Sequence, residues 1–339
     1  MSDFVTIWLP DAQSTASAGA SLRNSLFGPE STILLSGELG AGKTTFLQGF
    51  LRSLGVSTAV ISPTYALEQR YETPRGIVSH IDLYRLNEKD AVTLLRETEG
   101  TQSIRCIEWP ERVDEEMWRT IPAIHIHLKD SAKDGRDLRC AFRDIPLPST
   151  EQIVQWREDV LLPEHIRRHC DAVAAFAQRL ASLLLERGIL VRSLALARGG
   201  EVHDLLRFLD FRSGASPNGK EEYTEEQVRV WAQLKNRFGG LKHEAACAEF
   251  LRTHGFDALA EIVRVHGLVL PSPERTTIEQ KLLFYADKRV QIDRVVSLDD
   301  RFADFLVRYG SGKQTKESDL WYAEARALEQ ELFPEGAPS

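Results

Sequence analysis

The chain has 339 residues, of which 42% are hydrophobic and 27% are charged, and its formal net charge is −8. This length fits two ordinary domains better than one, and the composition is typical of a soluble globular protein. Lysine and arginine form no conspicuous run in the sequence. Any contact with nucleic acid must therefore be local or shared with a partner, because phosphate binding needs clustered positive charge.

Membrane insertion and disulfide stabilisation are both disfavoured. The N-terminus has no basic-then-apolar signal, and the most apolar stretch, residues 180–197, is interrupted by Glu186, Arg187 and Arg192. A membrane span needs about 20 mostly apolar residues. Cysteines without paired spacing favour a reducing compartment, so we expect a cytoplasmic protein without membrane contact. The cysteines are Cys106, Cys140, Cys170 and Cys247.

Residues 1–145 alternate short β-branched runs with helical patterns, which predicts an α/β domain with a mostly parallel sheet. In chain order, the patterns predict strands over 4–8, 32–36, 77–81, 104–107, 123–128 and 138–142, and helices over 11–27 and 44–54. Asp11 is a candidate N-cap of the first helix. The last two strands are expected to form a hairpin through the polar residues 129–136.

The character of the sequence changes at residues 146–158, which we expect to be a linker. Strand patterns then almost disappear, and helical patterns cover 165–186, 224–238, 243–254, 258–265, 277–289 and 297–309. Thr224 and Gln227 have the spacing of a capping box. These patterns predict an all-α domain over residues 159–312, followed by a polar C-terminal tail over 313–339 with one helix, 318–332.

A glycine-rich loop between a predicted strand and a predicted helix matches the Walker A pattern. Its glycines let the backbone wrap phosphates, while the loop N–H groups and the helix N-terminus supply positive potential. In this pattern Lys43 reaches the β- and γ-phosphates of ATP, and Thr44 ligates magnesium. The candidate nucleotide-binding residues are Gly37, Glu38, Leu39, Gly40, Ala41, Gly42, Lys43, Thr44 and Thr45.

Three polar residues elsewhere in this half are candidates for completing a hydrolase site. Asp82 directly follows a predicted strand, where a magnesium-facing carboxylate would lie. Glu108 ends the next predicted strand, where it could orient the attacking water or hold magnesium through water. Thr64 is a candidate γ-phosphate or metal sensor in a mobile switch loop. Taken singly, each also fits an ordinary strand-end acid or turn residue.

Four segments together resemble the TsaE (YjeE) family, the ATPase subunit of the machinery that makes threonylcarbamoyladenosine next to the tRNA anticodon. They are residues 37–45 (GELGAGKTT), 62–65 (SPTY), 80–86 (HIDLYRL) and 107–110 (IEWP). The resemblance covers roughly residues 1–145. It implies an ATP–magnesium site lined by Lys43, Thr44, Thr64, Asp82 and Glu108, the last two being the functional acids. It also implies that this half acts on a TsaB–TsaD partner pair, and through it on tRNA, without transferring the threonylcarbamoyl group itself.

The second half carries a set of histidines and aspartates at predicted helix ends and on predicted buried faces. Such mixed nitrogen and oxygen ligands suit divalent metals. Asp287 follows an apolar run, where an unpaired buried acid would be costly. Taken singly, each also fits an ordinary core or surface residue. The candidates are His169, His203, Asp204, His243, His266 and Asp287.

Residues 159–312 resemble the HD superfamily of metal-dependent phosphohydrolases, through segments that surround these same residues. The resemblance implies that His169, His203, Asp204 and Asp287 hold one metal, with iron, manganese or a similar divalent ion as the candidates. It further implies that a second metal is bound by the remaining pair, with Asp204 as the bridging and catalytic carboxylate. That pair is His243 and His266.

The expected substrate of this half is a nucleotide-like phosphate ester or phosphodiester. Lys288, Arg207 and Arg289 are candidate phosphate contacts, or else surface and salt-bridge residues.

The leading hypothesis is a bifunctional enzyme, an ATPase in tRNA modification joined to a metal-dependent phosphohydrolase. An alternative from a different class is a nucleotide-gated assembly module whose HD domain senses a ligand or docks a partner without turnover. A third interpretation is a small-molecule kinase.

Overall fold

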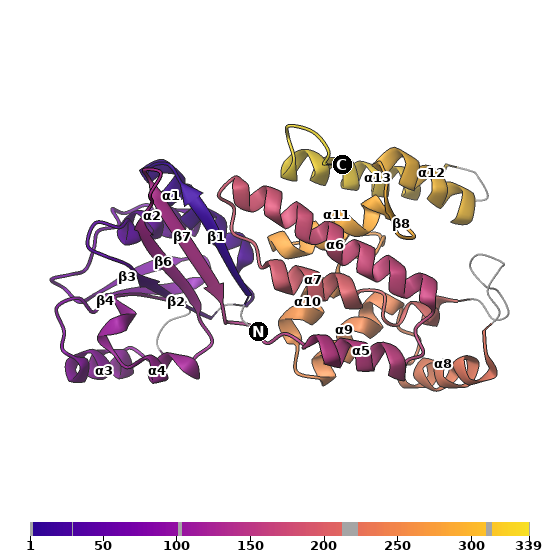
Figure 1. Cartoon of the computed structure of the whole chain (residues 1–339), viewed down its shortest axis with the longest axis horizontal. Helices are drawn as coiled ribbons and strands as arrows, with labels where there is room; N and C mark the ends of the chain where they lie inside the picture. Colours follow the sequence, from indigo (N-terminus) through magenta and orange to yellow (C-terminus); the bar gives the residue numbers. More distant parts are fainter. Residues whose placement is uncertain (1–2, 29, 101–103, 212–222, 310–313, 339) are drawn as a thin grey trace. The chain divides into compact units, whose positions relative to one another are not determined.

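The computed structural model describes residues 3–28, 30–100, 104–211, 223–309 and 314–338. The chain forms two compact units, shown in Figure 1. The first comprises Met1–Ile145 and Ser182–Ser193, and the second comprises Pro146–Ala181 and Leu194–Ser339. The first unit is an α/β domain and the second is helical.

The described residues of the first unit form a seven-stranded sheet with the order β1-β7-β6-β2-β5-β4-β3. The central strands β6, β2, β5 and β4 are mutually parallel, whereas β3, β7 and β1 are joined through antiparallel pairs. The mostly parallel sheet is therefore confirmed, and β3 is an addition to it. The strands are β1 (Asp3–Leu9), β2 (Ser31–Ser36), β3 (Glu68–Thr73), β4 (Gly76–Asp82), β5 (Ile104–Glu108), β6 (Ile124–Asp130) and β7 (Arg136–Phe142).

Alternate side chains of each strand point to opposite faces of the sheet. Both faces carry buried apolar residues, and helices cover both of them. Ile33 and Leu35 of β2 join a core with α1 (Ala12–Leu22) and α2 (Lys43–Ser53). Leu34 joins the opposite core with α3 (Glu88–Glu97) and α4 (Glu115–Arg119). Asp11 caps α1, as expected, by accepting a hydrogen bond from the Ser14 N–H. The helix ends at Leu22 rather than at residue 27, because a short 3-10 turn follows.

The first unit also includes a segment that lies well beyond its expected end at residue 145. Residues 182–193 contain the end of α6 (Glu164–Glu186) and the loop after it. Leu190 is fully buried in the same core as α1 and α2, and its N–H donates to Ser21 Oγ at 3.0 Å. Arg192 is also fully buried and bonds to the Asp144 carboxylate and the Ser25 carbonyl oxygen. The first unit is thus discontinuous in sequence.

The described residues of the second unit form helices and a short hairpin of β8 (Val290–Gln291) and β9 (Arg294–Val295). Thr224 and Gln227 form the expected capping box at the start of α8. The helices are α5 (Thr150–Asp159), most of α6, α7 (Ser193–Val202), α8 (Glu225–Arg237), α9 (His243–Thr253), α10 (Asp257–Arg264), α11 (Ile278–Arg289), α12 (Leu298–Tyr309) and α13 (Lys316–Leu332).

Two segments expected to lie outside the folded domains are instead part of the second unit. The expected linker, residues 146–158, contains most of α5, which starts at a capping box and buries Ile153 and Trp156. The expected polar tail, residues 313–339, contains α13 where one helix was expected over 318–332, but this helix packs on α11 and buries Leu328 and Leu332. Residues 313 and 339 of that tail lie outside the described residues. Both corrections have one cause: a few well-spaced apolar side chains anchor a helix that is otherwise polar.

None of the helices in the described part of the chain has the length and apolar character needed to cross a bilayer. The four cysteines are buried as free thiols.

Candidate functional site

The loop between β2 and α2 has the backbone conformation that phosphate binding requires. Gly37 and Gly42 have φ values of 134° and 103°, which favour glycine over other residues. A Cβ atom on Gly37 would lie 2.1 Å from the Leu128 carbonyl oxygen, so no side chain fits there. Gly42 is the N-cap of α2, so the free N–H groups of the first helical turn are next to the loop.

Lys43, the first residue of α2, is almost fully buried at the loop. Its Nζ atom donates to the carbonyl oxygens of Gly37 and Glu38 at 2.8 and 3.0 Å. It also lies 3.9 Å from the ring centroid of Trp109. Burial lowers the pKa of Lys43, although nearby carboxylates, chiefly Glu108, oppose that shift. The ammonium group is thus held where phosphate oxygens could replace the carbonyl partners.

Two carboxylates lie beside each other at the ends of neighbouring parallel strands. Asp82 of β4 is the register partner of Glu108 of β5, and each is only 2% exposed. Thr44 Oγ1 donates to Glu108 Oε1 at 3.2 Å, and His80 Nε2 lies 2.9 Å from the same oxygen. The hydroxyl expected to bind magnesium therefore shares a carboxylate oxygen with a buried imidazole.

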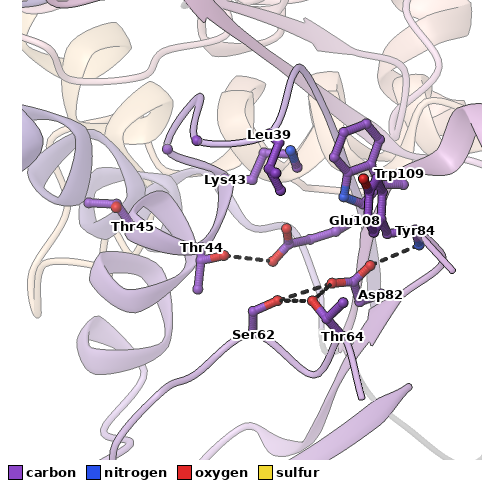
Figure 2. A pocket seen from close by; sticks show the side chains of 12 residues that line it. Leu39, Lys43, Thr44, Thr45, Ser62, Thr64, Asp82, Tyr84, Glu108 and Trp109 are labelled. Carbon is purple, nitrogen blue, oxygen red and sulfur yellow. Dashed lines mark hydrogen bonds between the residues drawn. The ribbon is translucent and has the colours of Figure 1, made fainter. Parts of the chain in front are cut away.

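The Asp82 carboxylate contacts the segment expected to act as a switch. Its Oδ2 atom accepts hydrogen bonds from Thr64 Oγ1 at 2.5 Å and Ser62 Oγ at 3.0 Å. The other oxygen, Oδ1, accepts the N–H of Tyr84 at 2.9 Å. Figure 2 shows these side chains and Thr44 with Glu108 facing the same pocket. The two acids therefore have different neighbours. Glu108 contacts Thr44 next to the phosphate-binding loop, whereas Asp82 contacts the Ser62–Thr64 segment.

These side chains surround a cavity of about 350 Å³. Most of the nucleotide-site residues expected from sequence line it, whereas Gly37, Glu38 and Ala41 belong to the loop but not to the lining. Ser62, Tyr84 and Trp109 were not assigned roles, and neither was His80, which lies behind Glu108. His80 is two positions before Asp82 on the same face of β4, so strand alternation could have identified it. The lining residues are Leu39, Gly40, Gly42, Lys43, Thr44, Thr45, Ser62, Thr64, Asp82, Tyr84, Glu108 and Trp109.

The second unit brings together all six of its expected metal-ligating residues, which come from different helices and helix ends. Asp287 of α11 is contacted from two sides, since its Oδ1 atom lies 3.0 Å from His169 Nε2 and 3.7 Å from His203 Nε2. The structure therefore forms a compact nitrogen and oxygen cluster from residues 118 positions apart in sequence.

Asp204 lies at the centre of the rest of this cluster. Its Oδ1 atom is 3.1 Å from His243 Nε2 and 3.5 Å from His266 Nε2, and its Oδ2 atom is 3.9 Å from His203 Nε2. Burial opposes ionisation of this carboxyl group, but the adjacent imidazoles, His203 first, and Arg207 hold the pKa of Asp204 well below its ordinary value. An ionised carboxylate between two groups of histidines is the arrangement expected of a bridging ligand.

The imidazole rings are oriented so that each presents Nε2 to the carboxylates. A carbonyl oxygen can only accept a hydrogen bond, so an Nδ1 atom that faces a carbonyl oxygen carries the proton. The Nε2 atom of that ring then keeps its lone pair, which is the form in which histidine binds a metal through Nε2. His203 Nε2 is buried and has no hydrogen-bond partner among the described residues. These observations fit a metal centre. The Nδ1 partners are Ile292 O for His169 (3.0 Å), Gly200 O for His203 (2.8 Å), Val263 O for His266 (2.6 Å) and Asp210 Oδ2 for His243 (2.6 Å).

Two acids beside His243 were not anticipated. Asp210 Oδ2 and Glu244 Oε2 lie 2.6 and 3.2 Å from its Nδ1 atom. Glu244 adjoins His243 in sequence, but Asp210 is 33 positions away and its sequence context gives no signal. Together they orient the imidazole from the side opposite Asp204.

The candidate phosphate contacts differ in their surroundings. Lys288 Nζ forms an ion pair with Asp287, and Arg207 Nη1 lies 2.9 Å from His243 Nε2, so both are at the cluster. Arg289 instead bonds to Tyr285 and to the Val296 carbonyl oxygen, so it fulfils the salt-bridge and packing alternative.

The comparisons with known proteins concern the first unit. The family model described as "Threonylcarbamoyl adenosine biosynthesis protein TsaE" matches residues 9–138. A protein of Nostoc sp. named "tRNA threonylcarbamoyladenosine biosynthesis protein TsaE" is 40% identical over 112 residues, which is 32% of this chain and 68% of the relative. A protein of the same name from Synechocystis sp. is 39% identical over 112 residues, or 31% of this chain and 70% of the relative. The crystal structure of Bacillus subtilis YdiB aligns with a TM-score of 0.35 and 23% identity, over 47% of this chain and 95% of that one.

Proposed function

The chain belongs to the TsaE family, and on this basis we propose that its first unit hydrolyses ATP in support of tRNA threonylcarbamoyladenosine biosynthesis. The observation that carries this proposal is the hydrogen bond of Thr44 to Glu108 inside a pocket that also contains Lys43. It joins the phosphate-binding loop to a carboxylate, and phosphoryl transfer depends on positioning and charge stabilisation by such groups.

The residues of the pocket divide this work among themselves. The loop N–H groups and the α2 N-terminus bind the phosphates, and Lys43 exchanges its carbonyl partners for phosphate oxygens. Thr44, Asp82 and Glu108 would hold magnesium, which would neutralise phosphate charge. Glu108 accepts a hydrogen bond from the attacking water. Asp82 fixes Ser62 and Thr64, so the Ser62–Thr64 segment responds to the state of the nucleotide.

The partners follow from the family. We propose a TsaB–TsaD-like pair, and through it tRNA, as the target of the ATPase unit in the cytoplasm. ATP turnover measured as phosphate release should therefore rise when such a pair is added. Lys43→Ala should abolish both nucleotide binding and turnover. If the Lys43→Ala chain retains full turnover, this pocket is not the ATPase site.

For the second unit we propose metal-dependent hydrolysis of a phosphate ester or phosphodiester, with a nucleotide-like substrate. The supporting observation is the set of Nε2 atoms from four histidines around Asp204 and Asp287. One or two divalent ions such as iron or manganese would be held there, and such ions activate water and neutralise charge on phosphorus oxygens. Asp204 bridges the two parts of the site, and Arg207 and Lys288 provide positive charge next to it.

A screen of phosphomonoesters, phosphodiesters and nucleotides with wild type and Asp204→Ala tests this second activity. We expect divalent metal to be bound by the wild-type chain and turnover of at least one substrate to be lost in Asp204→Ala. If metal is bound but no substrate is turned over, the unit is a ligand-sensing or docking module, and the chain is a nucleotide-gated assembly module. Phosphoryl transfer from ATP to an added metabolite would instead support a small-molecule kinase.

A further inference from the structure

The sheet of the first unit has an outer face with a distinct composition over strands β1, β7 and β6. The inward side chains of these strands belong to the core with α1 and α2. The outward side chains therefore form rows across the three strands, because their registers align Thr6 with Arg139 and His127. We use the term basic–aromatic face for Phe4, Trp8, His127, Lys129, Arg139 and Arg143, all of which are exposed.

Two large aromatic side chains remain exposed on this face. Phe4 and Trp8, at alternate outward positions of the edge strand β1, are 56% and 49% exposed. The Trp8 indole is fixed by its Nε1 hydrogen bond to the Asp134 carbonyl oxygen at 2.9 Å. The Arg139 guanidinium lies 4.8 Å from the Phe4 ring centroid. Rigid exposed rings beside a guanidinium provide flat surfaces on which other planar groups can stack.

The charge of this face contrasts with that of the whole chain. Lys129, Arg139 and Arg143 are exposed, and the outward acid among these rows, Asp137, is half-buried. The chain as a whole has a net charge of −8 and no basic run in its sequence. Strand pairing thus creates a local positive surface that the linear sequence does not show.

We propose that the basic–aromatic face binds an unpaired segment of RNA, with bases stacking on Trp8 and Phe4 and the phosphates paired with the basic side chains. Unpaired nucleic acid is recognised by this combination, because each base has a flat face and each phosphate a negative charge. An acidic protein segment would match the positive charge but would leave the two rigid rings without a planar partner.

The face adjoins the phosphate-binding loop of the same unit. Ser36, immediately before Gly37, lies 2.9 Å through its Oγ from the Nδ1 atom of His127. Arg136 Nη2, at the start of β7, donates to the Gly40 carbonyl oxygen at 3.4 Å. RNA bound on this face would therefore lie next to the loop proposed to bind ATP. The proposed ATPase activity does not by itself require an RNA-binding surface at this place.

The test is fluorescence anisotropy of a labelled 12-nucleotide unpaired RNA, titrated with the full-length chain at fixed salt and without nucleotide. Loss of a stacked ring costs about 1–3 kcal/mol per base, so Trp8→Ala should weaken binding roughly 5- to 150-fold. Trp8→Phe, which keeps a ring, should bind close to wild type. Arg139→Gln should also weaken binding and reduce its salt dependence. The matched charge control is Arg229→Gln on α8, whose side chain is 72% exposed.

Three results would overturn the proposal. In the first, Trp8→Ala and Arg139→Gln bind the RNA as well as wild type does. In the second, duplex RNA binds as well as unpaired RNA, which would mean that stacking plays no part. In the third, a polyglutamate peptide displaces the RNA at equal charge concentration, which would identify the face as a docking site for an acidic protein. Lys43→Ala should bind RNA like wild type, and Arg139→Gln should retain wild-type ATP turnover, so failure of this proposal is distinct from failure of the ATPase assignment.

Discussion

Thr44 Oγ1 and Glu108 Oε1 lie 3.2 Å apart although the two residues are 64 positions apart in sequence. The sheet order explains this contact, because β5 pairs directly with β2 and ends with Glu108 beside the loop that β2 leads into. Glu108 therefore contacts the Thr44 hydroxyl directly, and Asp82 lies one strand further along the sheet.

The first prediction concerns Glu108. Glu108→Gln keeps the shape of the side chain but removes the charge that accepts a proton from water, so nucleotide binding should persist. General-base assistance is worth about 10²- to 10⁴-fold, and we expect kcat to fall at least 100-fold. Steady-state phosphate release and binding of a fluorescent ATP analogue measure the two quantities. Glu116→Gln, on the exposed surface of α4, is the control. Unchanged kcat in Glu108→Gln would remove the assigned role.

The second prediction concerns His80, which is fully buried and lies 2.9 Å from Glu108. We expect it to act as a positioning residue for that carboxylate. Loss of a buried hydrogen-bond partner costs about 1–3 kcal/mol, so His80→Phe should lower kcat about tenfold or more while KM changes little. His80→Gln, whose amide can donate to Glu108, should recover part of the loss. Equal defects in KM for both variants would indicate a structural role only.

The third prediction concerns Asp210 and the metal cluster. The Asp210 carboxylate holds the His243 ring by a hydrogen bond with Nδ1. Residues that orient a metal-ligating histidine in this way typically contribute about 10- to 100-fold to metal affinity. Asp210→Asn should therefore release part of the bound metal at a lower chelator concentration than wild type, while the remainder, at His169 and Asp287, stays bound. Competition with a chromophoric chelator measures this difference. Identical release curves would contradict the role given to Asp210.

The fourth prediction concerns the discontinuous first unit. Leu190 is fully buried in the core with α1 and α2, and truncation of such a leucine costs about 2–5 kcal/mol. In urea titrations followed by binding of the ATP analogue, Leu190→Ala should lose the nucleotide-binding unit at a lower urea concentration than wild type. Val154→Ala, with a side chain that is 48% exposed in the second unit, should leave that transition unchanged. An unaffected transition in Leu190→Ala would show that residues 182–193 do not stabilise the first unit.

Local patterns predicted most of the first unit, because strong apolar runs and the glycine-rich loop are short-range signals. Helix α3 was missed because half of its residues are charged and it buries only Ala91 and Leu95. Helix α5 was hidden behind a proline-rich stretch that looks like a linker. The assignment of Leu190 and Arg192 to the first unit depends on contacts with residues more than 160 positions away, and no local pattern records such contacts.

The candidate sites show the same division between local and long-range information. The P-loop could be recognised from its own residues, and Asp82 and Glu108 from the ends of their strands. The pairing of Asp82 with Ser62 and Thr64, and of Glu108 with His80, depends on sheet order and could not be derived from spacing. The six candidate metal ligands, Asp204 among them, were identified from their residue types and a family resemblance, whereas the orientation of each imidazole by its Nδ1 partner is visible only in the folded chain.

The most direct test of two chemically distinct sites in one chain is the content of divalent transition metal in the purified full-length protein. We predict that wild type retains one or two ions per chain after dialysis, and that Asp204→Ala retains fewer because that carboxylate contacts both parts of the cluster. Lys43→Ala, altered only in the nucleotide pocket, should match wild type. A wild-type chain without bound transition metal, or an Asp204→Ala chain with the wild-type content, would contradict the account.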